Sequence, residues 1–174
     1  MSSVVFFRAV NVGGHQKFQP SLLAKKLADF GVVNIGAAGT FVVREAVSAA
    51  KLRTEIHGQL PFQPELIVCP AREVMALVRS EPFRRKPAGI EVVSYVTVMQ
   101  TPPKNLPALP LEQPAGKKWE VRLIGVSGRF VLSFWQRQQK GILYPNAVVE
   151  KQFGVSATTR NWNTILAITG ILCA

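Results

Sequence analysis

The chain has 174 residues, which is enough for one substantial hydrophobic core or for two small ones. Hydrophobic residues make up 48% of it, and this content excludes intrinsic disorder as the default state. Lys and Arg number 21 against 10 Asp and Glu, so the formal net charge is +11. A basic protein of this kind favours anionic partners such as nucleic acid, phosphorylated metabolites or acidic proteins, although the same charge also serves solubility alone.

Cysteine usage and hydropathy predict a cytoplasmic protein. Cys69 and Cys173 are far apart in apolar settings, which is typical of reduced thiols rather than of a disulfide framework. The N-terminal segment M-S-S-V-V-F-F lacks the basic region of a signal peptide. No apolar run approaches the roughly 18 residues that a membrane span needs. We therefore expect no membrane partner, and no sequence feature indicates an oligomeric state.

The first half of the chain predicts strands alternating with amphipathic helices. Apolar runs predict strands at 4–10, 32–35, 40–44 and 65–69, and helical spacing predicts helices at 20–30, 47–60 and 71–79. We expect Gly31 to end the first helix in a left-handed conformation. The order strand–helix–strand–strand–helix–strand matches the ferredoxin-like unit. The residues expected on the inner helix faces are Leu22, Leu23, Leu27, Phe30, Leu52, Ile56 and Leu60.

The second half predicts a smaller α+β unit. The segment 80–89, with two prolines and three adjacent bases, is a plausible boundary, so we expect subdomains at 1–85 and 90–174. Strands are predicted at 92–100, 118–124 and 129–137, with a proline-rich connector at 101–116 and a turn at 125–128. The expected fold class is α+β, in which a ferredoxin-like half precedes a short antiparallel sheet and two C-terminal helices.

The run from Pro145 to Thr164, P-N-A-V-V-E-K-Q-F-G-V-S-A-T-T-R-N-W-N-T, carries the strongest local signals. Pro145 can open a helix, and Gly154 stands in the position that ends one. Ser156 or Thr158 is then expected to cap a second helix. The residues expected on the inner face of that helix are Trp162, Ile165, Leu166, Thr169 and Leu172.

The start of this second helix is a candidate anion site. A helix N-terminus offers free amides and a partial positive charge, which suit a phosphate or carboxylate. The same residue types also crowd helix starts for capping alone, so a structural role stays open. The candidate binding residues are Lys151, Thr159, Arg160, Asn161 and Asn163.

A second candidate site is the loop after the first strand. Paired glycines let a backbone approach a phosphate closely, although they also mark simple tight turns. The loop is neither a G-x-G-x-x-G fingerprint nor a Walker A motif, because no G-K-[ST] follows. Its candidate residues are Arg8, Asn11, Gly13, Gly14 and Lys17.

Three segments resemble the bacterial domain-of-unknown-function family 1697. They are A-T-T-R-N-W-N-T with P-N-A-V-V-E-K ahead of it, F-R-A-V-N-V-G-G at 7–14, and G-T-F-V-V at 39–43. The family's second block usually reads R-G-I-N-V-G-G, so Ala9 replaces a glycine, and Ala38-Gly39-Thr40 replaces Ser-Gly-Asn. The resemblance implies an α+β fold with a ferredoxin-like first half. It implies no activity.

Three functions follow as alternatives. The first is binding of an anionic ligand, either nucleic acid or a phosphorylated small molecule. A variant reads 145–173 as a DNA-binding helix–turn–helix, but a three-helix context is missing. The second is a small-molecule enzyme or sensor with a pocket between the glycine loop and the C-terminal helix start. The third is a purely structural role for both blocks. We expect no cofactor and no metal, since His, Cys and carboxylates show no ligand spacing.

Overall fold

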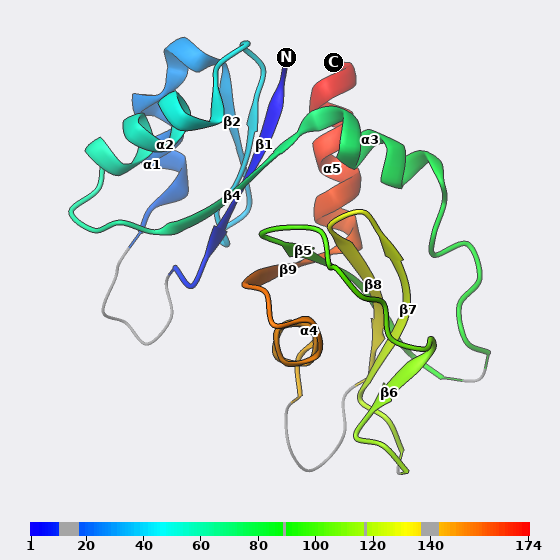
Figure 1. Ribbon diagram of the computed structural model, residues 1–174. Helices are drawn as coiled ribbons and strands as arrows, with labels where there is room; N and C mark the ends of the chain where they lie inside the picture. The colour runs from blue at the N-terminus through cyan, green and yellow to red at the C-terminus, as the bar shows by residue number, and fades with distance from the viewer. Residues whose placement is uncertain (11–17, 89, 117, 137–142) are drawn as a thin grey trace. The chain divides into compact units, whose positions relative to one another are not determined.

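The structure is a computed structural model that describes residues 1–10, 18–88, 90–116, 118–136 and 143–174 (Figure 1). The chain divides into two compact units, one of Met1–Arg79 with Thr164–Ala174 and one of Ser80–Asn163. Each unit contains one antiparallel sheet, and the described residues form five α-helices and one short 3-10 helix. The predicted α+β class is confirmed. The subdomain expected at 90–174 included the whole C-terminal helix, whereas residues from Thr164 onward belong to the first unit.

The first unit has the ferredoxin-like arrangement that the sequence predicts. Its sheet has the order β2-β3-β1-β4, and each neighbouring pair is antiparallel. Helix α1 lies between β1 and β2 in the chain, and helix α2 lies between β3 and β4. Both helices cover the same face of the sheet (Figure 1). The elements are β1 (Ser3–Arg8), α1 (Pro20–Lys26), η1 (Ala28–Phe30), β2 (Val32–Ile35), β3 (Thr40–Val43), α2 (Ala49–Gly58), β4 (Glu65–Pro70) and α3 (Ala71–Arg79).

Both faces of this sheet are buried. Successive strand residues point to opposite sides, and in β1 the residues of both sides are buried. Val5 and Phe7 of β1 pack under α1 and α2, together with Leu52 and Ile56. The intervening β1 residues are also fully buried, and helix α5 (Trp162–Cys173) lies along that second face (Figure 1). Arg44 Nη2 donates to the Ile171 carbonyl over 3.1 Å and ties α5 to the end of β3. The C-terminal helix therefore completes the first unit's core.

Two local expectations in this unit have different outcomes. Gly31 takes the left-handed conformation, with φ of 59°, as predicted. Leu22 was expected on the inner face of the first helix, but its side chain is 51% exposed. Helix α1 has only seven residues, and Leu23 with the capping residue Leu27 occupies the buried side, so Leu22 is rotated toward solvent.

Ala9 follows β1 with a φ of 55°, a conformation that L-residues other than glycine rarely adopt. This is the position at which the resembling family usually has glycine. The backbone there keeps the geometry that glycine favours, although the side chain has changed.

The second unit's sheet has the order β6-β7-β8-β5-β9. Strand β6 lies in the proline-rich segment that was expected to be a plain connector. The hairpin between β7 and β8 turns at Gly128 and Arg129 rather than across 125–128, because Gly125 stays inside β7 at a bulge. The elements are β5 (Val93–Met99), β6 (Leu111–Gln113), β7 (Val121–Ser127), β8 (Phe130–Trp135), α4 (Pro145–Phe153) and β9 (Ala157–Asn161).

The C-terminal motif contains a strand that the sequence analysis missed. Helix α4 begins at Pro145, and Gly154 ends it with φ of 64°, both as predicted. The expected cap at Ser156 or Thr158 is wrong, because the next residues form β9 along the edge strand position beside β5. This strand also excludes a helix–turn–helix. The β-branched pair Thr158-Thr159 suits a strand, which its polar character had concealed.

Helix α5 therefore starts later than expected, at Trp162. Its buried positions are Ile165 and Ile168, whereas Leu166, expected inside, is 40% exposed. In the described ranges, no helix combines the length and the apolarity needed to cross a membrane.

Substitutions at two glycines test how tightly the first unit is packed. Gly36 and Gly39 both have positive φ, 68° and 69°, but a Cβ at Gly36 meets nothing within 4 Å whereas one at Gly39 lies 2.9 Å from Phe7 Cβ. Gly36→Ala should lower the free energy of unfolding by about 1–2 kcal/mol, from backbone strain alone. Gly39→Ala adds a steric clash and should cost at least about 3 kcal/mol. Urea denaturation of both variants measures the difference, and equal losses would contradict this packing.

Candidate functional site

The two halves of the C-terminal motif meet on one face of the second unit's sheet. Helix α4 lies across this face, where Val148 and Val149 pack with Met99 and Ala157. Two polar contacts join α4 to β9. Thr159 Oγ1 donates to Asn146 Oδ1 over 3.3 Å, and the Ala157 amide donates to Glu150 Oε1 over 2.8 Å.

Strand alternation in β9 separates residues that the sequence analysis grouped as one site. Thr159 pairs with Thr97, and Ala157 with Met99, so these positions face α4 together with Asn161. Thr158 and Arg160 point to the opposite face. The candidate residues 159–161 therefore do not converge on one ligand.

Arg160 is buried and lies in β9, not at a helix start. Its side chain is 6% exposed. Its Nη1 donates to Thr158 Oγ1 over 2.8 Å and to the Thr159 carbonyl over 3.0 Å. Burial lowers the pKa of Arg160 to about 10, so the guanidinium still carries its charge at neutral pH. The expectation that Arg160 lies at the start of the second helix is wrong, because Arg160 belongs to β9.

Asn161 precedes the first residue of α5, Trp162, and Asn163 lies in its first turn. Asn161 Oδ1 accepts from the Asn163 amide over 2.9 Å, which is the geometry of a helix cap. The Asn161 side chain thus satisfies a backbone donor that a phosphate was expected to occupy. Asn163 is exposed.

Lys151 is exposed on α4 and borders a crevice of about 260 Å³. The crevice combines apolar walls with two glutamine side chains and this one base. Its other lining residues are Gln113, Leu143, Ala147, Val148 and Gln152.

The N-terminal loop candidates Asn11, Gly13, Gly14 and Lys17 lie outside the described residues. Arg8 is described, and its Nη1 forms an ion pair with Glu65 Oε2 at 2.8 Å, across the register pair that joins β1 to β4. This contact holds two strands together. The expected pocket between the loop and the C-terminal block stays a prediction.

An aromatic cluster that the sequence analysis missed lies on the α4 face. The Tyr144 and Trp135 rings stack with centroids 6.0 Å apart and an interplanar angle of 10°, and Tyr95 meets Trp135 edge-on at 6.4 Å. Asn146 and Thr159 lie in the same part of the fold, since Asn146 follows Tyr144 by two residues and Thr159 faces α4 from β9. We call these five residues the aromatic–amide patch.

The pKa of the Tyr95 hydroxyl in this patch is raised. Burial raises the pKa of Tyr95 above its ordinary value of 10.0, and the nearby Tyr144 phenol raises it further. The Tyr95 hydroxyl can therefore both donate and accept a hydrogen bond at neutral pH.

The described residues contain no group of three His, Cys, Asp or Glu side chains that could hold a metal ion. The predicted absence of a cofactor stays a prediction.

Comparison with known proteins gives a family and a fold. The model of DUF1697, a protein family of unknown function, matches residues 1–127. The segment A-T-T-R-N-W-N-T at 157–164, which contributed to the resemblance, lies beyond the matched residues. The solved structure of the conserved bacterial protein SP0830 from Streptococcus pneumoniae is similar over 98% of each chain, with a TM-score of 0.55 and 14% identity. At that identity the similarity shows the fold alone. No curated protein matches the sequence.

The contact between β5 and β9 can be tested through two threonines. Thr97 is fully buried, and its Oγ1 lies 2.8 Å from Thr159 Oγ1. Thr159→Val leaves the Thr97 hydroxyl without this contact and should cost about 1–3 kcal/mol of unfolding free energy. The double variant Thr97→Val with Thr159→Val should cost less than the sum of the single changes. Additive losses in denaturant titrations would show that the two hydroxyls do not interact.

The coupling between the two tyrosines can be measured directly, because the chain contains only Tyr95 and Tyr144. In Tyr144→Phe, the pKa of Tyr95 should fall but stay above 10.0, since burial is the larger cause of its elevation. Absorbance of tyrosinate during alkaline titration reads this value. Because the unfolded chain loses the proton first, stability should decrease as pH rises past 10.0. An unchanged midpoint in the variant would mean that the two phenols are not close.

Proposed function

We propose that this chain, which belongs to the DUF1697 family of proteins of unknown function, binds an anionic ligand, either nucleic acid or a phosphorylated molecule. The observation that carries the proposal is the imbalance of exposed charge. Among the described residues, twelve Lys and Arg side chains are exposed against five Asp and Glu. The exposed bases are Lys25, Lys26, Arg44, Lys51, Arg72, Arg79, Arg84, Arg85, Lys86, Lys104, Lys118 and Lys151.

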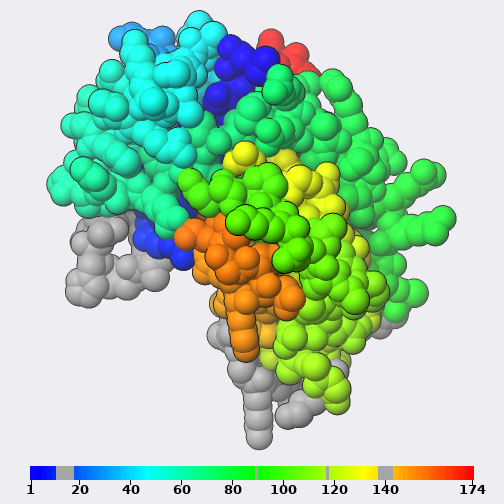
Figure 2. Space-filling model, in the orientation of Figure 1, coloured from blue at the N-terminus to red at the C-terminus, as the bar shows by residue number. Residues whose placement is uncertain are grey.

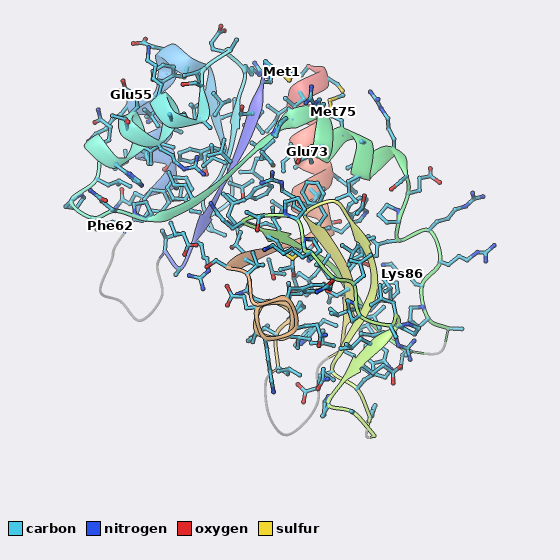
Figure 3. The ribbon with its side chains drawn as sticks, viewed as in Figure 1. Met1, Glu55, Phe62, Glu73, Met75 and Lys86 are labelled. Atoms are coloured by element: carbon cyan, nitrogen blue, oxygen red, sulfur yellow. The ribbon has the colours of Figure 1, made fainter. Side chains whose placement is uncertain are left out.

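The three adjacent bases after α3 support this proposal. Phe83, which is 6% exposed, packs against Phe134 and Trp162 with ring centroids 5.6 Å and 5.1 Å away. This anchor fixes the start of the segment Arg84–Lys86, whose three side chains are exposed. Figure 3 labels Lys86 in this segment.

A backbone turn also positions this segment. The Arg84 amide donates to the Glu81 carbonyl over 3.1 Å, and Glu81 itself has a positive φ of 45°. In Figure 2 the green segment forms separate projections at the surface. Exposed bases that need no rearrangement suit a polyanion, because electrostatic binding to phosphates requires only that the charges be accessible.

A structural role is the second candidate for the C-terminal block alone. The contacts of Arg160 with Thr158 and Thr159, and the cap formed by Asn161, favour it. These residues account for much of the motif without a ligand. Anion binding then falls to exposed side chains elsewhere on the surface.

Titration of labelled single- and double-stranded DNA and RNA over a salt series tests the proposal. The affinity should fall as salt rises, with a slope of about 0.7 to 0.9 per phosphate contact. In Arg84→Gln with Arg85→Gln, the slope should decrease by about 1.4 to 1.8. The matched control is Lys25→Gln with Lys26→Gln, which removes the same charge from exposed positions of α1 and should change the slope less.

Binding that is undetectable or independent of salt would overturn the proposal. Equal slopes for both double variants would keep anion binding and remove the Arg84–Lys86 segment as its centre.

A further inference from the structure

We propose that the aromatic–amide patch binds an unpaired nucleobase, so that the anionic ligand is a nucleotide or a single-stranded nucleic acid. The inference rests on the proposed function and names the chemistry of its ligand. The patch comprises Tyr95, Trp135, Tyr144, Asn146 and Thr159.

The stacked rings provide the surface on which a base would lie. One face of Tyr144 is stacked on Trp135 at 6.0 Å, yet the Tyr144 side chain is 53% exposed. Its other face is therefore in contact with solvent. Exposed aromatic rings are the usual platform for unpaired bases, because every base has a flat π-face that stacks on them.

The polar groups around the rings suit the edge of a base. Within the described part of the chain, neither tyrosine hydroxyl nor the Asn146 Nδ2 atom makes a hydrogen bond, since Asn146 is engaged through its oxygen to Thr159. An amide and two phenol hydroxyls offer both donors and acceptors, which matches the mixed pattern on the edges of nucleobases. None of the five patch residues is a carboxylate, and the Glu120 carboxylate beside the patch accepts a hydrogen bond from the Leu143 amide over 2.9 Å.

The fold makes the patch rigid. Trp135 Nε1 donates to the Leu143 carbonyl over 2.8 Å and fixes the indole beside the start of α4. Asn146 is held by Thr159, and Thr159 by Thr97. A binding surface whose side chains are already oriented loses little conformational entropy when a ligand arrives.

The charge of the protein selects among ligands that stack on aromatic rings. Neutral sugars also stack on tyrosine, but a net charge of +11 gives them no advantage. A nucleotide gains both from stacking and from attraction of its phosphate. Lys151, the only basic residue of α4, is exposed on the helix that also carries Asn146. Bases in a duplex are already stacked on one another, so the patch favours single strands.

The test compares four ligands on the full chain: a uridine-rich RNA oligonucleotide, an RNA duplex of the same length, a mononucleotide and inorganic polyphosphate. Wild-type protein should bind the single strand more tightly than the duplex. Tyr144→Ala should weaken single-strand binding by about 5- to 150-fold, which is the range for loss of one base–aromatic stack. Its affinity for polyphosphate should not change.

Two control variants separate stacking from folding. Tyr144→Phe keeps the ring and should retain most of the affinity for the single strand. Leu106→Ala removes a side chain of the same unit that is 65% exposed, and it should leave all four affinities unchanged. Thermal melting of each variant confirms that it is folded at the temperature of the assay.

The four ligands also distinguish the outcomes. Saturable mononucleotide binding that Tyr144→Ala abolishes supports a nucleotide ligand, and a gain with oligonucleotide length supports a single strand. If Tyr144→Ala binds the single strand as wild type does while polyphosphate binds, the patch is overturned and anion binding survives. If the wild type binds none of the four ligands, both proposals fail.

Discussion

The second unit depends on the pairing of β9 with β5. Five residues of the C-terminal motif extend along the sheet, from the Ala157–Met99 pair to the Asn161–Tyr95 pair. Because neighbouring strand residues face opposite sides, this register decides that Thr159 contacts α4 and that Arg160 is buried on the other face. A shift by one residue would bury Thr159 in place of Arg160 and would separate Asn146 from its partner. The same register sets where α5 begins.

The burial of Arg160 shows what this pairing costs and how the cost is reduced. A guanidinium taken out of water loses hydration, and burial lowers its pKa to about 10. The nearby Thr158 hydroxyl and Thr159 carbonyl accept hydrogen bonds from it and replace part of that hydration. Arginine tolerates such a site because its charge persists and its donors lie in one plane. The sequence indicates that Arg160 is an exposed ligand-binding residue, whereas the structure shows it as a buried residue of β9.

Surface charge and the aromatic–amide patch are separate features, and they act on different parts of a nucleotide. Exposed basic side chains such as those of Arg84 and Lys86 attract phosphates at a distance and without regard to the nucleotide sequence. Tyr144 and Asn146 would contact a base only at short range. The two proposals therefore differ in salt dependence, since stacking between neutral rings is little affected by ionic strength.

Apart from α5, whose place in it was not predicted, the strands and helices of the first unit follow from the sequence. Local signals suffice there, because Gly31 ends a helix through its own backbone freedom and apolar runs of four to six residues mark each buried strand. The same holds for α4, from Pro145 to Gly154. The family resemblance followed from short motifs and needed no structure.

In the second unit, the edge strands β6 and β9 and the site depend on tertiary contacts that the sequence does not predict. The polar residues from Thr158 to Asn161 have the composition of a helix start, and their strand conformation comes from hydrogen bonds to β5, about sixty residues earlier in the chain. Tyr95, Trp135 and Tyr144 likewise meet because three distant segments share one sheet face. A local pattern reports what a segment prefers by itself, whereas a sheet edge and a side-chain cluster depend on partners that the pattern does not name.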